Sequence, residues 1–127
     1  METTTIAGAE VSRIGLDTWA IGGLEWGKVS DEAAVATCLS ALERGINLID
    51  TAPIYGHGRS EEVVGKAIRA HGRREDFYVA TKAGLEWNAS GVFTNSTGRG
   101  CAASWKRACA AWARSTSTST RFTGPIL

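Results

Sequence analysis

The feature of this sequence that most constrains its fold is a regular alternation of strand-like and helix-like segments over residues 10–97. The short apolar runs INLID and FYVATK, which contain β-branched and aromatic residues, are typical of buried strands. The segments SDEAAVATCLSALERG and SEEVVGKAIRAHG carry apolar residues at helical spacing. Strands that alternate with helices predict βαβ units, and therefore a parallel sheet.

The two predicted helices carry capping residues at both ends. Ser30 and Ser60 stand where an N-cap side chain would accept a backbone N–H, and acidic residues follow each of them, where the helix dipole favours negative charge. Gly45 and Gly72 follow the helical runs and can adopt the left-handed conformation that ends a helix. The sequence therefore predicts two helices bounded by these four residues.

The first strand decides between two parallel architectures. This strand is predicted within VSRIGLDTWAIGG, and Gly22-Gly23 ends it. No G-x-G-x-x-G motif follows the strand, so a doubly wound dinucleotide-binding sheet is not supported. A complete (β/α)8 barrel needs about 250 residues, whereas this chain has 127. Three strands and two helices therefore fit either a smaller α/β domain or part of a barrel.

Composition argues against several classes of function. A net charge of +1 gives no basis for binding nucleic acid or an anionic membrane, and no apolar run approaches the roughly 20 residues that span a bilayer. The start METTTIAGAE lacks a basic region followed by an apolar core, so we expect a cytoplasmic protein. The three cysteines, Cys38, Cys101 and Cys109, form no C-x-x-C pair, and we expect no metal site.

Three polar residues follow the predicted strands at the edge where parallel sheets bind ligands. Asp50 ends the second strand, Tyr55 lies in the loop beyond it, and Lys82 ends the third strand. Taken singly, they could be a turn cap, a half-buried aromatic and a solvated charge. Together they form an Asp–Lys–Tyr array, in which the cation makes the tyrosine hydroxyl a better proton donor. The array therefore predicts a general acid.

These residues lie in motifs that resemble a known family. SRIGLDTWAIGG, GINLIDTAPIYGHGRSEEVVGKAI and FYVATKAGLEW are similar to the N-terminal third of the aldo-keto reductases, and most similar to a bacterial branch with L-G-T-W-A-I-G-G. The resemblance implies an α/β fold that is part of a (β/α)8 TIM barrel, limited to its first three strands and two helices. It also implies binding of NADP(H) without a Rossmann domain.

The resemblance implies a role for each site residue. The family reduces aldehydes and ketones reversibly to alcohols, so these small molecules are the expected partners. Tyr55 would protonate the carbonyl oxygen, Lys82 and Asp50 would tune it, and Thr18, Trp19 and Asp50 would line the nicotinamide-ribose end of the cofactor site. One residue departs from the pattern, because Asp17 stands where the family usually has Gly. A carboxylate there is expected to crowd or repel the cofactor.

The segment from residue 98 onward does not continue the family pattern. The family has a fourth strand with a His, in a motif such as D-L-Y-Q-V-H-W-P-D-P, but residues 98–127 contain the Ser/Thr repeat ARSTSTSTRFTGPIL instead. Such a repeat is typical of a flexible linker. The alternative is a shift of the reading frame between about residues 97 and 98.

Codon arithmetic favours the shifted frame. When each codon is read from its third base, Trp105-Lys106 gives an obligatory Glu and Trp112-Ala113 an obligatory Gly. Residues 122–125 permit Val-His-Trp-Pro, and the whole segment permits a sequence close to the family's next helix and fourth strand. We therefore predict residues 1–97 as the N-terminal part of an aldo-keto reductase barrel, and residues 98–127 as a frameshifted tail without native fold, disordered or irregular.

Three hypotheses about function follow. The first is an aldo-keto reductase by descent that is truncated, inactive as this chain and no longer able to bind NADP(H). The second is a non-catalytic interaction module, which would self-associate or bind a partner through the open edge of its sheet. The third is an autonomous small α/β domain followed by a disordered tail.

Overall fold

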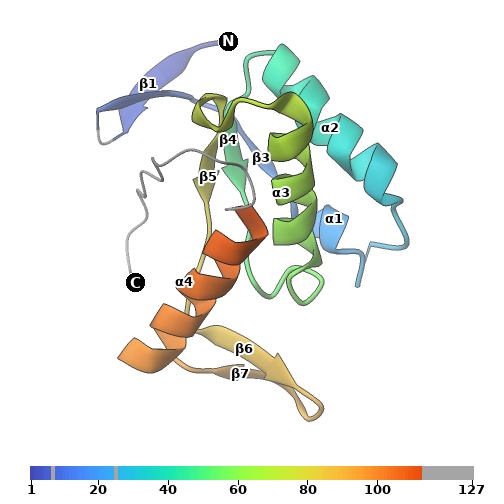
Figure 1. Cartoon of the computed structure of the whole chain (residues 1–127), viewed down its shortest axis with the longest axis vertical. Helices are drawn as coiled ribbons and strands as arrows, with labels where there is room; N and C mark the ends of the chain where they lie inside the picture. The colour runs from blue at the N-terminus through green and yellow to red at the C-terminus, as the bar shows by residue number, and fades with distance from the viewer. Residues whose placement is uncertain (7, 25, 113–127) are drawn as a thin grey trace.

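A computed structural model describes residues 1–6, 8–24 and 26–112. At its centre is a parallel sheet of order β3-β4-β5, formed by β3 (Gly15–Asp17), β4 (Leu48–Asp50) and β5 (Tyr78–Ala80) (Figure 1). Helix α2 (Asp31–Glu43) connects β3 to β4, and α3 (Arg59–His71) connects β4 to β5. The predicted order of strands and helices and the parallel sheet are confirmed.

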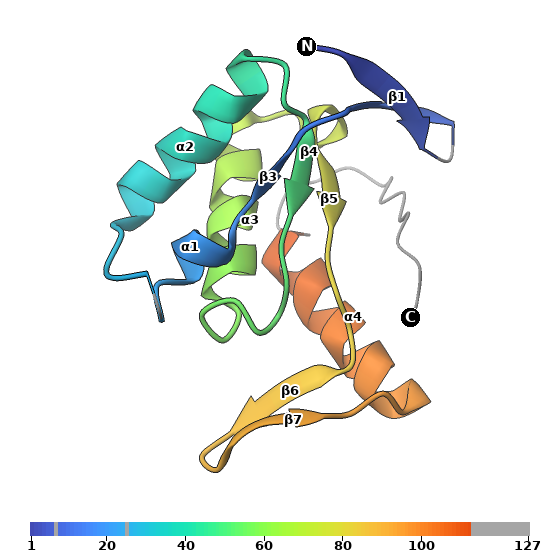
Figure 2. The same cartoon turned by 180° about the vertical axis from the view of Figure 1, so that it is seen from behind.

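The helices cover one face of this sheet. Figures 1 and 2, seen from opposite sides, show α3 in front of the strands in one view and behind them in the other, with α2 beside α3 in both. This is the layering of a barrel wall, with strands inside and helices outside. The predicted partial TIM barrel is therefore confirmed.

Helix α3 stands between two apolar clusters. One joins α3 to β4, to the segment before β5 and to α4 (Gly98–Trp112), and the other joins α3 to α2 and to the short helix α1 (Trp19–Gly22). Each fully buried aliphatic or aromatic side chain contributes about 1.5–3 kcal/mol. The members are Ile49, Val64, Ile68, Phe77, Ala108 and Trp112 in the first cluster, and Ile21, Ala34, Cys38, Val63 and Ala67 in the second.

Helix ends follow the predicted caps with one exception. The Ser30 hydroxyl accepts a hydrogen bond from Ala33 N at 3.2 Å, and Gly72 ends α3 with φ of 84°. The prediction that Ser60 caps α3 was wrong, because the N-cap lies two residues earlier, at Gly58 with φ of 93°, and the helix begins at Arg59. Ser60 therefore lies inside the first turn, with its side chain buried.

Two hairpins and a 3-10 turn add to the predicted elements. The antiparallel pair β1 (Thr3–Ile6) and β2 (Ala9–Ser12) lies at the amino ends of the parallel strands, and η1 (Arg74–Asp76) precedes β5. The pair β6 (Leu85–Asn88) and β7 (Gly91–Thr94) follows β5 at the opposite end of the molecule (Figure 2).

The prediction of irregular structure from residue 98 was wrong for residues 98–112, which form α4. Its buried residues recur every fourth position, which gives the helix a single packing stripe: Gly100, Ser104, Ala108 and Trp112. The backbones of α3 and α4 are close, since a Cβ added to Gly65 would lie 2.2 Å from the carbonyl oxygen of Ala111. The predictions for residues 113–127 lie outside the described residues.

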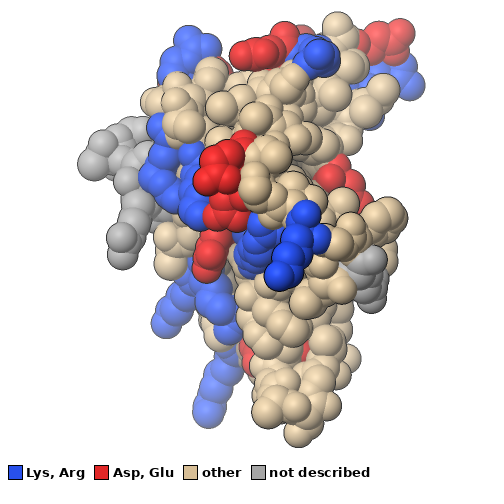
Figure 3. Space-filling view, turned by 90° about the vertical axis from the view of Figure 1, so that its right-hand side faces the viewer, with Lys and Arg blue, Asp and Glu red and all other residues tan. Residues whose placement is uncertain are grey.

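The surface agrees with the small net charge. On the face shown in Figure 3, Lys and Arg side chains lie next to Asp and Glu, without a field of one sign. No helix among the described residues is long and apolar enough to cross a bilayer.

Candidate active site

The fold brings the three predicted catalytic residues together. Asp50 is the last residue of β4, Tyr55 lies in the loop before α3, and Lys82 follows β5. Lys82 Nζ donates to both carboxylate oxygens of Asp50, at 2.9 and 2.7 Å, and to the carbonyl oxygen of Thr51 at 3.0 Å. The same nitrogen lies 4.9 Å from the centroid of the Tyr55 ring. The structure therefore contains the cation beside a tyrosine that the sequence predicts.

Lys82 keeps its charge in this setting. Burial lowers the pKa of Lys82, but its interactions with Asp50 and Tyr55 raise it more, so the net pKa is above the ordinary value. The side chains of Lys82 and Asp50 are 49% and 38% exposed, so water screens their attraction, which contributes less than about 1 kcal/mol to stability. The pair fixes a cation near Tyr55 more than it stabilises the fold.

An aromatic wall adjoins the array. The Trp19 ring stacks on the Tyr55 ring with centroids 5.9 Å apart and planes at 12°, and Trp26 contacts Trp19 edge-on at 6.2 Å. Trp19 and Trp26 are 47% and 61% exposed, so large apolar surface remains open to solvent. A Cβ on Gly56 would lie 2.3 Å from the carbonyl oxygen of Gly22, so only glycine allows α1 to approach the Tyr55 loop.

Asp17, the residue that departs from the family pattern, lies beside Asp50. The two residues are paired in the parallel register of β3 and β4. Asp17 Oδ1 accepts a hydrogen bond from the backbone N–H of Trp19 at 2.7 Å. Its exposed carboxylate therefore holds the backbone that carries the Trp19 ring, and places a second negative charge at the edge of the site.

Thr18, a predicted cofactor residue, has its side chain buried instead of facing the array. Its hydroxyl donates to the carbonyl oxygen of Asp50 at 2.8 Å and accepts from the hydroxyl of Ser60. Thr51 donates to the same Ser60 hydroxyl at 3.1 Å, and all three residues have 0% exposure. These hydroxyls tie the ends of β3 and β4 to the first turn of α3, a contact that sequence reasoning missed.

Glu61 is a second residue that sequence reasoning missed. Only 2% of it is exposed, and its Oε1 accepts a hydrogen bond from the Thr81 hydroxyl at 2.7 Å. Burial raises the pKa of Glu61, while the Thr81 bond and the Arg107 charge lower it, with a net rise. The sequence placed Glu61 and Glu62 alike in a first turn, and no local pattern distinguishes the buried one from the exposed one.

Arg59 joins the first turn of α3 to the loop after α1. Its guanidinium donates to the carbonyl oxygens of Ile21 and Val29, and to Oδ1 of Asp31 at 2.9 Å. Hydrogen bonds from Lys66 and Arg59 hold the pKa of Asp31 below its ordinary value. Arg59 therefore fixes the loop that carries Trp26.

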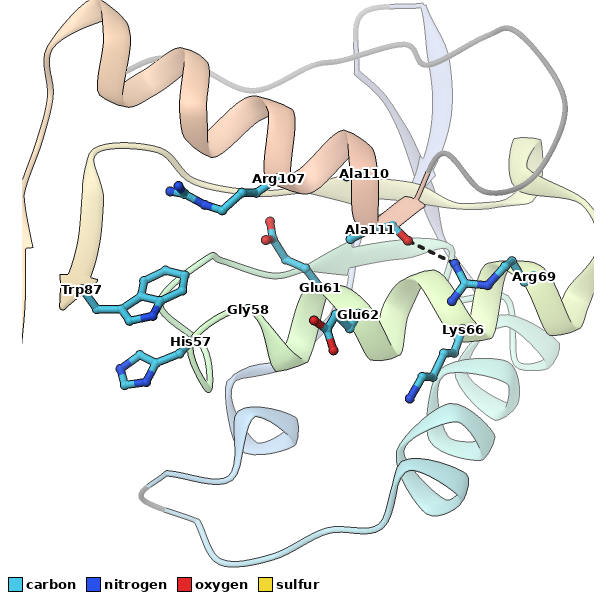
Figure 4. Close-up of a pocket in the computed structure, with 10 residues that line it drawn as sticks. All are labelled: His57, Gly58, Glu61, Glu62, Lys66, Arg69, Trp87, Arg107, Ala110 and Ala111. Carbon is cyan, nitrogen blue, oxygen red and sulfur yellow. Dashed lines mark hydrogen bonds between the residues drawn. The ribbon is translucent and has the colours of Figure 1, made fainter. Parts of the chain in front are cut away.

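A cavity of about 480 Å³ lies between α3, α4 and β6 (Figure 4). His57 stacks on Trp87 at its rim, with ring centroids 5.2 Å apart, and the Arg107 guanidinium lies 5.5 Å from the Trp87 centroid. Its lining residues are His57, Gly58, Glu61, Glu62, Lys66, Arg69, Trp87, Arg107, Ala110 and Ala111. None of the three array residues lines it, so the cavity is separate from the array. Among the described residues, no cluster of three or more His, Cys, Asp or Glu could hold a metal ion.

Parallel strands under outer helices, with an Asp–Lys–Tyr array at the strand ends, form a segment of a TIM barrel. The family model described as "Aldo/keto reductase family" matches residues 13–110. The chain belongs to the aldo/keto reductase family.

This chain spans about a third of the length of the similar proteins. It is 51% identical over 98 residues to the aldo-keto reductase YhdN of Bacillus subtilis. The aligned region covers 76% of this chain and 30% of YhdN. The glycerol dehydrogenase of Gluconobacter oxydans superposes with a TM-score of 0.77 at 40% identity, over 87% of this chain and 36% of its own. An aldo-keto reductase of Klebsiella pneumoniae, solved in complex with NADPH, superposes with a TM-score of 0.63 at 25% identity. The superposition covers 89% of this chain and 36% of that one.

The residues present fit the nicotinamide end of such a cofactor in part. The half-exposed Asp50 carboxylate can accept hydrogen bonds from sugar hydroxyls, and the exposed Trp19 ring offers an apolar surface. The buried Thr18 hydroxyl already donates a hydrogen bond to the backbone of Asp50 and accepts one from Ser60. Asp17 adds a negative charge beside Asp50, which disfavours an anionic ligand.

Proposed function

We propose that this chain carries the proton-donating part of a carbonyl reductase site. The observation that supports the proposal is the Lys82 ammonium, which contacts both oxygens of Asp50 and lies over the ring of Tyr55. A cation held beside a phenol stabilises the phenolate that proton transfer leaves behind. Tyr55 is then the proton donor to a carbonyl oxygen, or the acceptor from an alcohol in the reverse direction.

The proposed cofactor is NADP(H), which would supply or accept the hydride when bound. The structures that support this choice include a relative solved in complex with NADPH. Asp50 and Trp19 would hold the nicotinamide end, while Thr18 would act through the backbone of Asp50. The proposed substrates are small aldehydes, ketones and alcohols, and we propose the cytoplasm as the site of action.

We further propose that residues 1–127 are not active by themselves, because residues 98–127 are encoded in a shifted frame. The chain spans about a third of the length of its relatives, 30% of YhdN. Catalysis of this kind depends on holding cofactor and substrate in place, and an incomplete barrel provides little of that positioning.

Two proteins test the proposal in parallel. One is the present chain, and the other is the product of a gene in which the frame after residue 97 has been restored. We expect glyceraldehyde reduction with NADPH only in the restored protein, and its loss on Tyr55→Phe. NADPH-dependent reduction by the present chain that Tyr55→Phe abolishes would contradict the inactive part, and a restored protein indifferent to Tyr55→Phe would contradict the proton-donor part.

The sheet edges favour a second candidate function, that of an interaction module. Within residues 1–6, 8–24 and 26–112, β3 and β5 each pair only with the central strand β4. Strands with one unpaired edge are templates for further pairing, and the candidate therefore predicts self-association. A single monomeric species in size-exclusion chromatography with light scattering, together with no partner recovered by pull-down, would remove this candidate.

A further inference from the structure

Three consecutive residues in the first turn of α3 contact every segment that carries the site. Arg59 binds α1 at Ile21 and the loop after it at Val29, and Ser60 binds Thr18 and Thr51 at the ends of β3 and β4. Glu61 binds Thr81 at the end of β5. These segments are separated from the turn by up to 42 residues in the sequence, so the turn links parts of the chain that have no local connection.

We propose that Glu61 is a positioning residue, which holds the end of β5 through Thr81 and thereby keeps the Lys82 ammonium beside Asp50 and Tyr55. The inference rests on the proposed function for what the array does. Its test measures the titration of Lys82, which depends on the contacts of its ammonium, and needs no catalysis.

The geometry at the end of β5 carries the proposal. The backbone N–H of Thr51 binds the carbonyl oxygen of Ala80 at 2.9 Å, which holds β5 at its last residue. One residue further on, the Thr81 hydroxyl donates to Glu61 at 2.7 Å, and the next residue is Lys82. A lysine side chain is flexible, so its ammonium is held in one place only when both its polar contacts and the backbone that carries it are fixed. The Thr81–Glu61 bond fixes that backbone.

The burial of Glu61 distinguishes it from a solvated helix charge. A buried carboxyl group is costly unless hydrogen bonds satisfy it, and Glu61 is 2% exposed whereas its neighbour Glu62 is exposed. Arg107 of α4 faces Glu61 across the cavity (Figure 4), but the same guanidinium also lies 3.6 Å from Glu86 and over the Trp87 ring. The close partner of the Glu61 carboxyl is therefore Thr81.

An NMR titration of the Lys82 side chain in the full 127-residue chain tests this role. We expect Glu61→Ala and Thr81→Val to lower the pKa of Lys82, because the ammonium moves away from Asp50 and Tyr55, whose interactions raise it. Glu61→Gln should restore the wild-type titration, since its amide oxygen can accept the same hydrogen bond from Thr81. Glu62→Ala, one position away and exposed, is the matched control and should leave Lys82 unchanged.

Two results would overturn the proposal. One is a folded Glu61→Ala or Thr81→Val chain in which Lys82 titrates as in the wild type, and the other is a Glu61→Gln chain that behaves like Glu61→Ala. If Glu61→Ala fails to fold, the other two variants still test the proposal, because Thr81→Val should lower the pKa of Lys82 and Glu61→Gln should leave it as in the wild type. A failure of the proposed function would look different, because Lys82 would respond to Glu61 as expected while the frame-restored protein reduced no carbonyl.

Discussion

Helix α3 packs against two regions of the molecule in different ways. Its first turn meets the strand ends through buried polar groups, each matched to a particular atom, as Ser60 is to Thr18 and Glu61 to Thr81. Its later turns meet α4 through an apolar stripe with Ala108 and Trp112. The first kind of contact needs specific residues, whereas the second needs only apolar residues at the right spacing.

This difference explains how α4 can form in a segment that we propose is read out of frame. An alanine-rich composition favours helix formation and an apolar stripe favours docking, and residues 98–112 have both. The match to the family model runs from residue 13 to residue 110, so it includes most of α4. A packed helix is thus weak support for an inherited site, whereas the matched polar contacts of the first turn are strong support.

The largest expected effect tests whether α4 is part of the folded core. Trp112→Ala removes a side chain that is 3% exposed in the cluster with Ile49 and Phe77, and should lower the free energy of unfolding by about 3 kcal/mol. The half-exposed Trp105 on the same helix is the control, and Trp105→Ala should cost clearly less. Urea unfolding measures both, and equal costs would mean that α4 is not docked as described.

The next effect concerns the close approach of α1 to the Tyr55 loop. Gly56→Ala should destabilise the protein by about 2 kcal/mol and separate the stacked Trp19 and Tyr55 rings, because the new Cβ would meet the carbonyl oxygen of Gly22 at 2.3 Å, at φ of 61°. Gly58→Ala is the matched control, with φ of 93° but open space around its Cβ. Unfolding curves and tryptophan fluorescence report the two effects. A Gly58→Ala chain as disturbed in fluorescence as Gly56→Ala would argue against steric contact.

A smaller effect should appear in the pH dependence of stability. Burial raises the pKa of Glu61 above the ordinary 4.5, so the folded state binds more protons than the unfolded state in the window between the two values. Stability attributable to Glu61 is therefore present below pH 4.5 and falls as the pH rises through the folded pKa. Glu61→Gln should remove this slope, and the free energy of unfolding against pH measures it. An unchanged slope would show that Glu61 does not titrate as a buried group.

The smallest expected change lies within the array. Asp50→Asn should lower the pKa of Lys82, because the carboxylate that raises it is lost, with little change in stability for a half-exposed pair. Asp31→Asn removes a carboxylate that pairs with Lys66 and Arg59 instead, so it should leave Lys82 unchanged. Side-chain NMR of Lys82 distinguishes the two variants. Equal responses would indicate a general charge effect in place of a direct contact.

The sequence allowed the central fold to be predicted because its determinants are local. Ser30 and Gly72 mark helix ends, and the apolar runs mark the strands, without reference to the rest of the chain. The array residues were also predictable, because the carboxyl ends of parallel strands share one edge. Their mutual contacts in the structure follow from that topology.

The remaining features could not be predicted because they depend on distant neighbours. Ser60 was interpreted as a cap, although its hydroxyl binds Thr18, 42 residues away, and only the folded sheet brings the two together. The burial of Glu61 depends in the same way on Thr81. Helix α4 does have a local pattern, the four-residue spacing up to Trp112, and this pattern is unrelated to the family motif expected after the third strand.

The most direct test of this account is the nucleotide sequence that encodes residues 95–127 and the bases beyond. Read from the third base of each codon after residue 97, it should encode Val-His-Trp-Pro at residues 122–125 and continue without a stop into further strands and helices of the barrel. A shifted frame that meets a stop codon, or that encodes no His at this place, would contradict the account. Residues 98–127 would then be a native tail, and α4 an inherited part of this chain.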